Sequence, residues 1–136
     1  ILEEIIFKND KIYSPLSLFL IIDQELVKDE KIVIKYFDEI LSINDLEKED
    51  LNLLKLKKAI FISENAGEKD LLDLLNPIIN SGSVWKTQSI YFLGDYFFQK
   101  KSFIKSRQYY SDLLNMDNLS VDTNEIKRRI KLIDDK

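Results

Sequence analysis

Apolar residues recur at spacings of three and four over almost the whole chain, and this spacing predicts α-helices throughout. Residues 1–8 have the pattern of the end of one helix. Seven further helices, joined by short links, are predicted at residues 14–27, 30–42, 46–65, 68–80, 84–99, 102–115 and 122–134. Only 3 Gly and 2 Pro occur among 136 residues, which favours long helices over a loop-rich β fold.

Candidate capping residues support several of these boundaries. A small polar residue at the N-cap accepts a hydrogen bond from the first turn, and a Glu three residues later completes a capping box. The candidates are Ser14 (with Pro15 in the first turn), Asn44 (with Glu47), Ser83, Ser102 and Asp122 (with Glu125). The links inside consecutive pairs are only about two to four residues long, which predicts antiparallel neighbours. We therefore expect hairpins at about 14–42, 46–80 and 84–115, and a capping helix at about 122–134.

Gly94 lies in the interior of the helix predicted at 84–99, where glycine costs ~1 kcal/mol relative to alanine and therefore calls for a packing reason. Ile90-x-x-Leu93-Gly94-x-x-Phe97 is followed by Ser106-x-x-x-Tyr110. We interpret Gly94 and Ser106 as the small residues at the crossing of two closely packed helices. This spacing resembles the tetratricopeptide repeat, with Ile90 in place of the usual Trp and Ser106 in place of the usual Ala.

The predicted fold class is all-α, a tetratricopeptide-like right-handed array of three antiparallel helical hairpins plus the capping helix, in a single domain at 1–136. The stretches 83–86, 94–97 and 107–110, together with the helix opening at 14–18, resemble bacterial proteins of the ancillary SecYEG translocon subunit (YfgM-like) group. That resemblance implies a domain at the periplasmic face of the inner membrane that binds translocon or chaperone subunits. The group's transmembrane helix is not in this chain, so membrane attachment is expected only through an anchor outside it, and a cytoplasmic location is the alternative.

The first helix of each hairpin lines the concave groove in such arrays. Counting from Gly94, the predicted partner-binding residues are Gln88, Tyr91, Asp95 and Phe98, with Leu18, Ile22 and Glu25 in the first hairpin. Aromatic residues beside polar groups suit a peptide-binding surface. The alternative is that the last helix or a second copy of the chain covers these residues.

Composition argues against catalysis and nucleic-acid binding. The chain has no Cys and no His, so the commonest general base and thiolate chemistry are missing, and we expect no catalytic, cofactor or metal site. A net charge of −4 and a pI near 5.0 do not suit nucleic acid. We expect a protein-interaction scaffold of the bacterial envelope, and the alternatives are a cytoplasmic adaptor or a structural oligomerisation domain without a peptide groove. A homodimer is compatible with these interpretations, and an enzyme ranks last.

Overall fold

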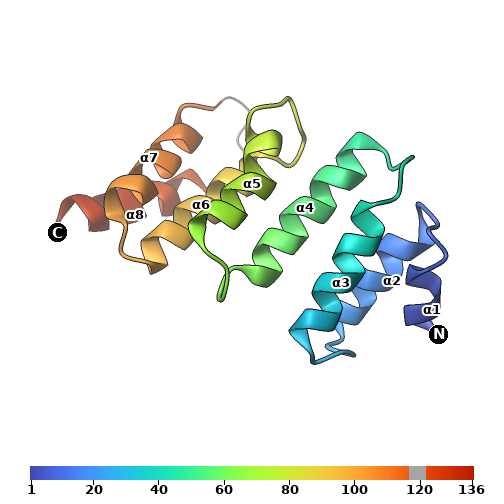
Figure 1. The fold of residues 1–136 in the computed structure, drawn as a ribbon. Helices are drawn as coiled ribbons and strands as arrows, with labels where there is room; N and C mark the ends of the chain where they lie inside the picture. Colours follow the sequence, from blue (N-terminus) through green and yellow to red (C-terminus); the bar gives the residue numbers. More distant parts are fainter. Residues whose placement is uncertain (117–121) are drawn as a thin grey trace. The chain divides into compact units, whose positions relative to one another are not determined.

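The computed structural model describes residues 1–116 and 122–136, and these ranges hold eight α-helices and no strand (Figure 1). The all-α prediction is confirmed. The helices are α1 (Leu2–Ile6), α2 (Tyr13–Asp23), α3 (Glu30–Leu41), α4 (Lys48–Ile62), α5 (Glu68–Ile79), α6 (Lys86–Gln99), α7 (Phe103–Leu114) and α8 (Thr123–Asp134). None of the helices described is long and apolar enough to cross a lipid bilayer.

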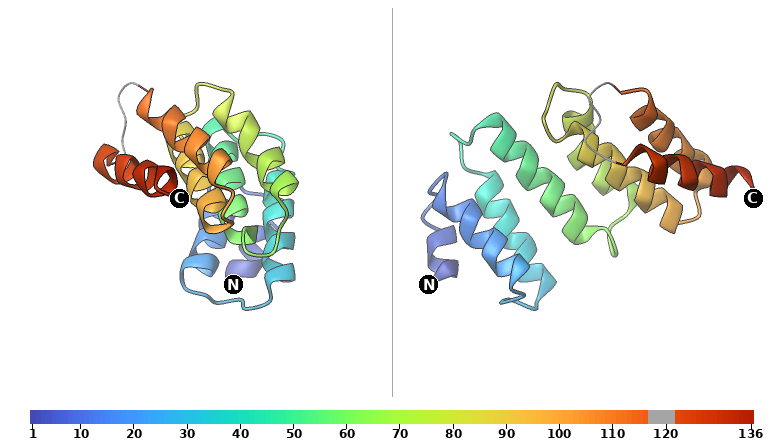
Figure 2. Two further views of the ribbon diagram at one scale, coloured as in Figure 1. Left: turned by 90° about the vertical axis from the view of Figure 1, so that its left-hand side faces the viewer. Right: turned by 180° about the vertical axis from the view of Figure 1, so that it is seen from behind.

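The chain divides into an N-terminal unit, Ile1–Lys58, and a C-terminal unit, Ala59–Lys136. In the N-terminal unit, α2 packs against both α1 and α3, as the ribbon shows (Figure 1). In the C-terminal unit, α6 packs between α5 and α7, and α8 lies against α7 (Figure 2). Helices adjacent in sequence thus pack in hairpin-like pairs, as predicted for 14–42 and 84–115. Most of the predicted link between residues 115 and 122 lies outside the described residues.

The capping predictions have mixed outcomes in the C-terminal unit. Asp122 is the N-cap of α8, and its carboxylate accepts a hydrogen bond from the Asn124 N–H at 2.9 Å, as predicted. Ser83 accepts from the Trp85 N–H at 3.1 Å in the turn that leads into α6. Ser102 is the N-cap of α7, but its side chain makes no capping hydrogen bond. Asp122 and Ser102 are thus both N-cap residues as predicted, but only Asp122 makes a capping hydrogen bond through its side chain.

The predicted N-cap at Ser14 is wrong, because α2 begins one residue earlier. The Asp10 carboxylate accepts from the backbone N–H groups of Ile12 and Tyr13, both at 2.8 Å, and so serves the first turn. The buried Ser14 hydroxyl instead donates to the Ile5 carbonyl at 2.7 Å, which ties α2 to the end of α1. Asn44 is also not an N-cap, since it lies in a turn before α4 begins.

Residues with a left-handed backbone follow the ends of two helices, α2 and α6. Glu25 has a φ of 50° and Lys101 a φ of 61°, the left-handed region that glycine usually occupies after a helix. Next to them, the Leu26 N–H donates to the Ile21 carbonyl, and the Ser102 N–H donates to the Phe97 carbonyl. These bonds satisfy carbonyls at the helix ends. Helix α2 consequently ends at Asp23 and not at residue 27.

Gly94 marks a close contact between α6 and α7, as its place in the sequence predicts. A Cβ atom built on Gly94 would lie only 2.6 Å from Cε1 and 2.8 Å from Cδ1 of Tyr110. The Ser106 hydroxyl donates to the Gly94 carbonyl at 2.8 Å in a buried contact. Gly94, Ser106 and Tyr110 are all buried, so a larger side chain at position 94 or 106 has no free space.

We expect Gly94→Ala to destabilise the protein by roughly 1–2 kcal/mol, because overpacking against the fully buried Tyr110 ring outweighs the gain in helix propensity. Urea unfolding followed by circular dichroism measures the change. Gly82→Ala is the matched control, since nothing lies within 4 Å of an added Cβ there. Equal stabilities for Gly94→Ala and the wild-type protein would contradict the assignment of a close contact.

Candidate functional site

Three of the four predicted partner-binding residues of α6 contact α8 or the apolar cluster that includes it. Asp95 and Tyr91 contact Arg129 of α8, and Phe98 packs on the cluster to which α8 contributes its isoleucines. Gln88 is exposed. This arrangement corresponds to the alternative in which the last helix covers the face, while partner binding by these residues remains a prediction.

Arg129 is the polar centre of this face. Its guanidinium donates to the Asp95 carboxylate and, at 2.9 Å, to the Tyr110 hydroxyl, while Nε donates to Glu125 at 3.1 Å. The Tyr110 hydroxyl in turn donates to Asp95 Oδ1 at 2.6 Å. The Arg129 side chain is 25% exposed, so these charge-assisted bonds form in a partly desolvated setting. They join α6, α7 and α8 at one point.

Burial and the hydrogen bonds of this network shift the pKa values of Tyr110 and Glu125. The pKa of Tyr110 is raised well above its usual range, first because of burial and then because its hydroxyl donates to Asp95. Hydrogen bonds from Arg128 and Arg129 lower the pKa of Glu125 to about 2. Tyr110 therefore stays neutral and Glu125 stays ionised near neutral pH.

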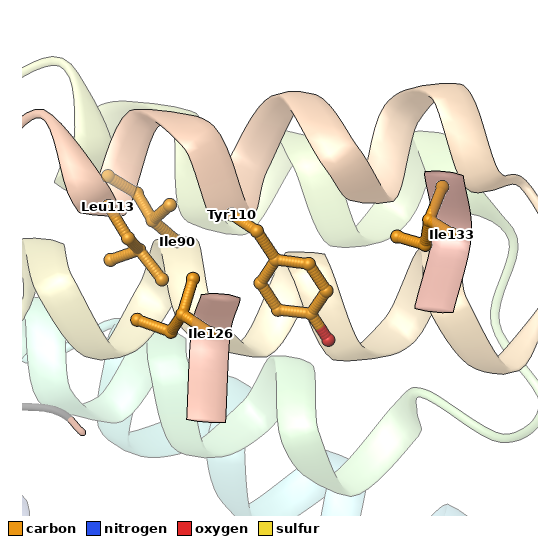
Figure 3. Packing of buried hydrophobic residues seen from close by; sticks show 5 residues of the cluster. All are labelled: Ile90, Tyr110, Leu113, Ile126 and Ile133. Atoms are coloured by element: carbon orange, nitrogen blue, oxygen red, sulfur yellow. The ribbon is translucent and has the colours of Figure 1, made fainter. Parts of the chain in front are cut away.

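An apolar cluster next to this network packs α8 against α6 and α7 (Figure 3). Its buried members come from all three helices, and the close-up shows the isoleucines of α8 beside the Tyr110 ring. They are Ile90 from α6, Tyr110 and Leu113 from α7, and Ile126 and Ile133 from α8. Ile126 and Ile133 are only 0% and 8% exposed, so these two side chains of α8 are almost fully buried in this contact.

The three candidates of the N-terminal unit lie in different environments. Leu18 is fully buried in the core of that unit and has no surface for a partner. Ile22 is half-buried at the end of α2, and Glu25 is exposed in the turn after it. The contacts of α1 and α3 with α2 explain this placement, since they cover the face that carries Leu18.

The exposed face of α2 carries a stripe that the sequence reasoning missed, the α2 stripe, formed by Ile12, Leu16 and Leu20. These side chains are 58%, 51% and 47% exposed, and they follow one another at intervals of four residues. Beside them is a pocket of ≈270 Å³ lined by Lys11, Ile12, Pro15, Leu16, Phe19, Asp50 and Leu53. The available signal was that α2 is apolar on all sides, although only one side can face the unit's core.

The described residues hold no group of three or more His, Cys, Asp or Glu side chains suited to a metal ion. No model of a known protein family, no curated protein and no solved structure matches the chain. A function for this protein therefore has to be inferred from the surfaces of its two units.

We expect Arg129→Ala to lower the free energy of unfolding by about 1 kcal/mol, because it removes charged hydrogen bonds from a partly buried pair of acceptors. Arg128→Ala is the matched control, since the Arg128 side chain is 60% exposed and forms an ion pair with Glu125 of its own helix. Denaturant titration compares the two variants. Equal effects of the two substitutions would count against Arg129 as the polar attachment of α8.

The stability provided by Glu125 should depend on pH at the acid end. Because its pKa falls from 4.5 to about 2 on folding, its contribution is present above 4.5 and is lost as the pH falls through about 2. The fall in urea midpoint between about pH 5 and about pH 2.5 should be smaller in Glu125→Gln than in the wild-type protein. An equally steep fall in both proteins would show that Glu125 does not contribute.

Proposed function

We propose that this protein is an interaction scaffold that binds another protein through the α2 stripe and its adjoining pocket. The observation that carries the proposal is the exposure of three large apolar side chains at intervals of four residues along α2 and its N-cap residue Ile12. Scattered exposed leucines are ordinary, whereas a continuous apolar stripe beside an apolar pocket marks a binding surface. Binding a partner would remove this surface from water.

The shape of the surface fits an amphipathic helix of the partner. Side chains spaced by four residues form a ridge, and a second helix packs against such a ridge with its own apolar side chains. The pocket has room for an anchoring aliphatic or aromatic residue between Pro15, Phe19 and Leu53. Lys11 and Asp50 line the same pocket and offer opposite charges for orienting the partner.

A tetratricopeptide-like arrangement and a place in the bacterial envelope belong to the same proposal. The Gly94, Ser106 and Tyr110 contact supports a hairpin of that type, since small residues meet where its helices cross. The resemblance to the ancillary translocon group suggests secretion or chaperone proteins as partners. The alternative, an oligomerisation domain, would use the α2 stripe to bind a second copy.

A photo-crosslinking residue at position 16 should capture a specific partner in native cells, whereas the same residue at position 104 should not. Ile104 is the matched control because it is an exposed apolar residue, at 89%, on α7 of the other unit. Leu20→Asp should abolish capture from position 16 without loss of helicity, because it places a charge in the stripe.

Recovery of translocon or periplasmic chaperone subunits from position 16 supports the envelope scaffold. Recovery of cytosolic proteins alone supports the cytoplasmic adaptor and contradicts the envelope location. Crosslinks only to a second copy, with a matching mass by light scattering, would replace the scaffold with the oligomerisation domain. Identical products from positions 16 and 104 would refute binding through the stripe.

A further inference from the structure

A second surface, in the C-terminal unit, already holds a helix. The face formed by α6 and α7 is occupied by α8, whose apolar stripe reaches the cluster of Ile90, Tyr110 and Leu113 (Figure 3). The stripe of α8 is formed by Ile126, Ile130 and Ile133, at intervals of four and three. This is the spacing with which an amphipathic helix docks into an apolar groove.

Polar contacts fix the direction and register of α8 on this face. Arg129, between the first two isoleucines, binds Asp95 and Tyr110. Near the other end, Arg107 of α7 holds Asp134 by two hydrogen bonds of 2.7 and 3.2 Å. A helix placed in the reverse direction would put its basic side chain near Arg107 and its acid near Asp95, so like charges would disfavour it.

We propose that the α6–α7 face is a binding groove for an amphipathic helix of the pattern Ile-x-x-Arg-Ile-x-x-Ile-Asp, and that α8 is its intramolecular occupant. The partner is a helix that carries aliphatic residues at these positions and an Arg for Asp95 and Tyr110. Such a helix binds by displacing α8. Occupation by α8 identifies the kind of ligand because α8 itself shows which side chains the groove accepts.

The contacts of α8 suit an exchangeable ligand better than a core element. Only Ile126 and Ile133 are buried among its 12 residues, and its two ion pairs with α6 and α7 use side chains that are 25–48% exposed. Exposed and half-exposed ion pairs contribute little net free energy because solvent screens them. The free energy that holds α8 on this face is therefore modest, and a competing helix with the same contacts can displace it. This inference is independent of the α2 stripe, which belongs to the other unit.

The test uses the full chain and a fluorescein-labelled peptide of residues 122–136. The double variant Ile126→Ser, Ile133→Ser weakens the resident α8 and should bind the peptide, as measured by fluorescence anisotropy. The wild-type protein should bind it more weakly, since α8 competes. A peptide with Arg129→Ala is the matched control and should bind the variant about fivefold more weakly, the modest loss expected for a partly exposed charged contact.

Hydrogen exchange on the wild-type protein tests displacement directly. At saturating peptide, the amides of α8 should exchange faster while those of α6 and α7 do not. Unchanged exchange of α8 would mean that α8 is a permanent cap, and the proposal would fail. Equal affinity of both peptides would also overturn it, because the Asp95 contact would then contribute nothing.

A second variant covers the case in which the double variant loses its helicity. Arg129→Ala, Asp134→Ala keeps the apolar stripe of α8 and removes only its polar contacts. It should bind the wild-type peptide more tightly than the wild-type protein does. If a fully helical variant fails to bind the peptide, the groove does not accept a helix from solution and the proposal is wrong.

Discussion

The C-terminal unit depends on the close approach of α6 and α7 at Gly94. With no side chain at that position, the Tyr110 ring lies directly against the α6 backbone, and the Ser106 hydroxyl reaches the Gly94 carbonyl. With the ring in this position, the Tyr110 hydroxyl lies 2.6 Å from Oδ1 of Asp95, the residue after Gly94 in α6. Asp95 and Tyr110 together then form the acceptor site for Arg129, so the polar contacts of α8 depend on the close packing at Gly94.

The two units use their apolar helices differently. In the C-terminal unit, α8 covers the apolar surface of α6 and α7 and adds the polar contacts that fix its register. In the N-terminal unit, α1 and α3 pack on one side of α2, and the opposite side keeps Ile12, Leu16 and Leu20 at about half exposure. The apolar surface of α6 and α7 is thus covered by a helix, whereas the α2 stripe is exposed within the described residues.

Much of the helical framework could be predicted because it rests on local spacing. The helices at 30–41, 68–79 and 123–134 begin and end within a residue or so of their predicted bounds, and Asp122 caps α8. Ser14 was misread because an Asp four residues earlier serves the first turn and α1 takes the serine hydroxyl. Leu18 was placed in the groove by register with Gly94, yet the contacts of α1 and α3 decide which side of α2 is buried.

The sequence by itself determined where the helices lie and where two of them had to meet closely, because periodicity and a glycine in a helix interior are properties of neighbouring residues. Tertiary structure alone decided what covers each face. The partners Asp95 and Arg129 are 34 residues apart, and Arg107 and Asp134 are 27 apart, so no local pattern joins them. Such pairs depend on how packed helices place side chains in space, and that placement explains why the α6 face is covered while the α2 stripe is not.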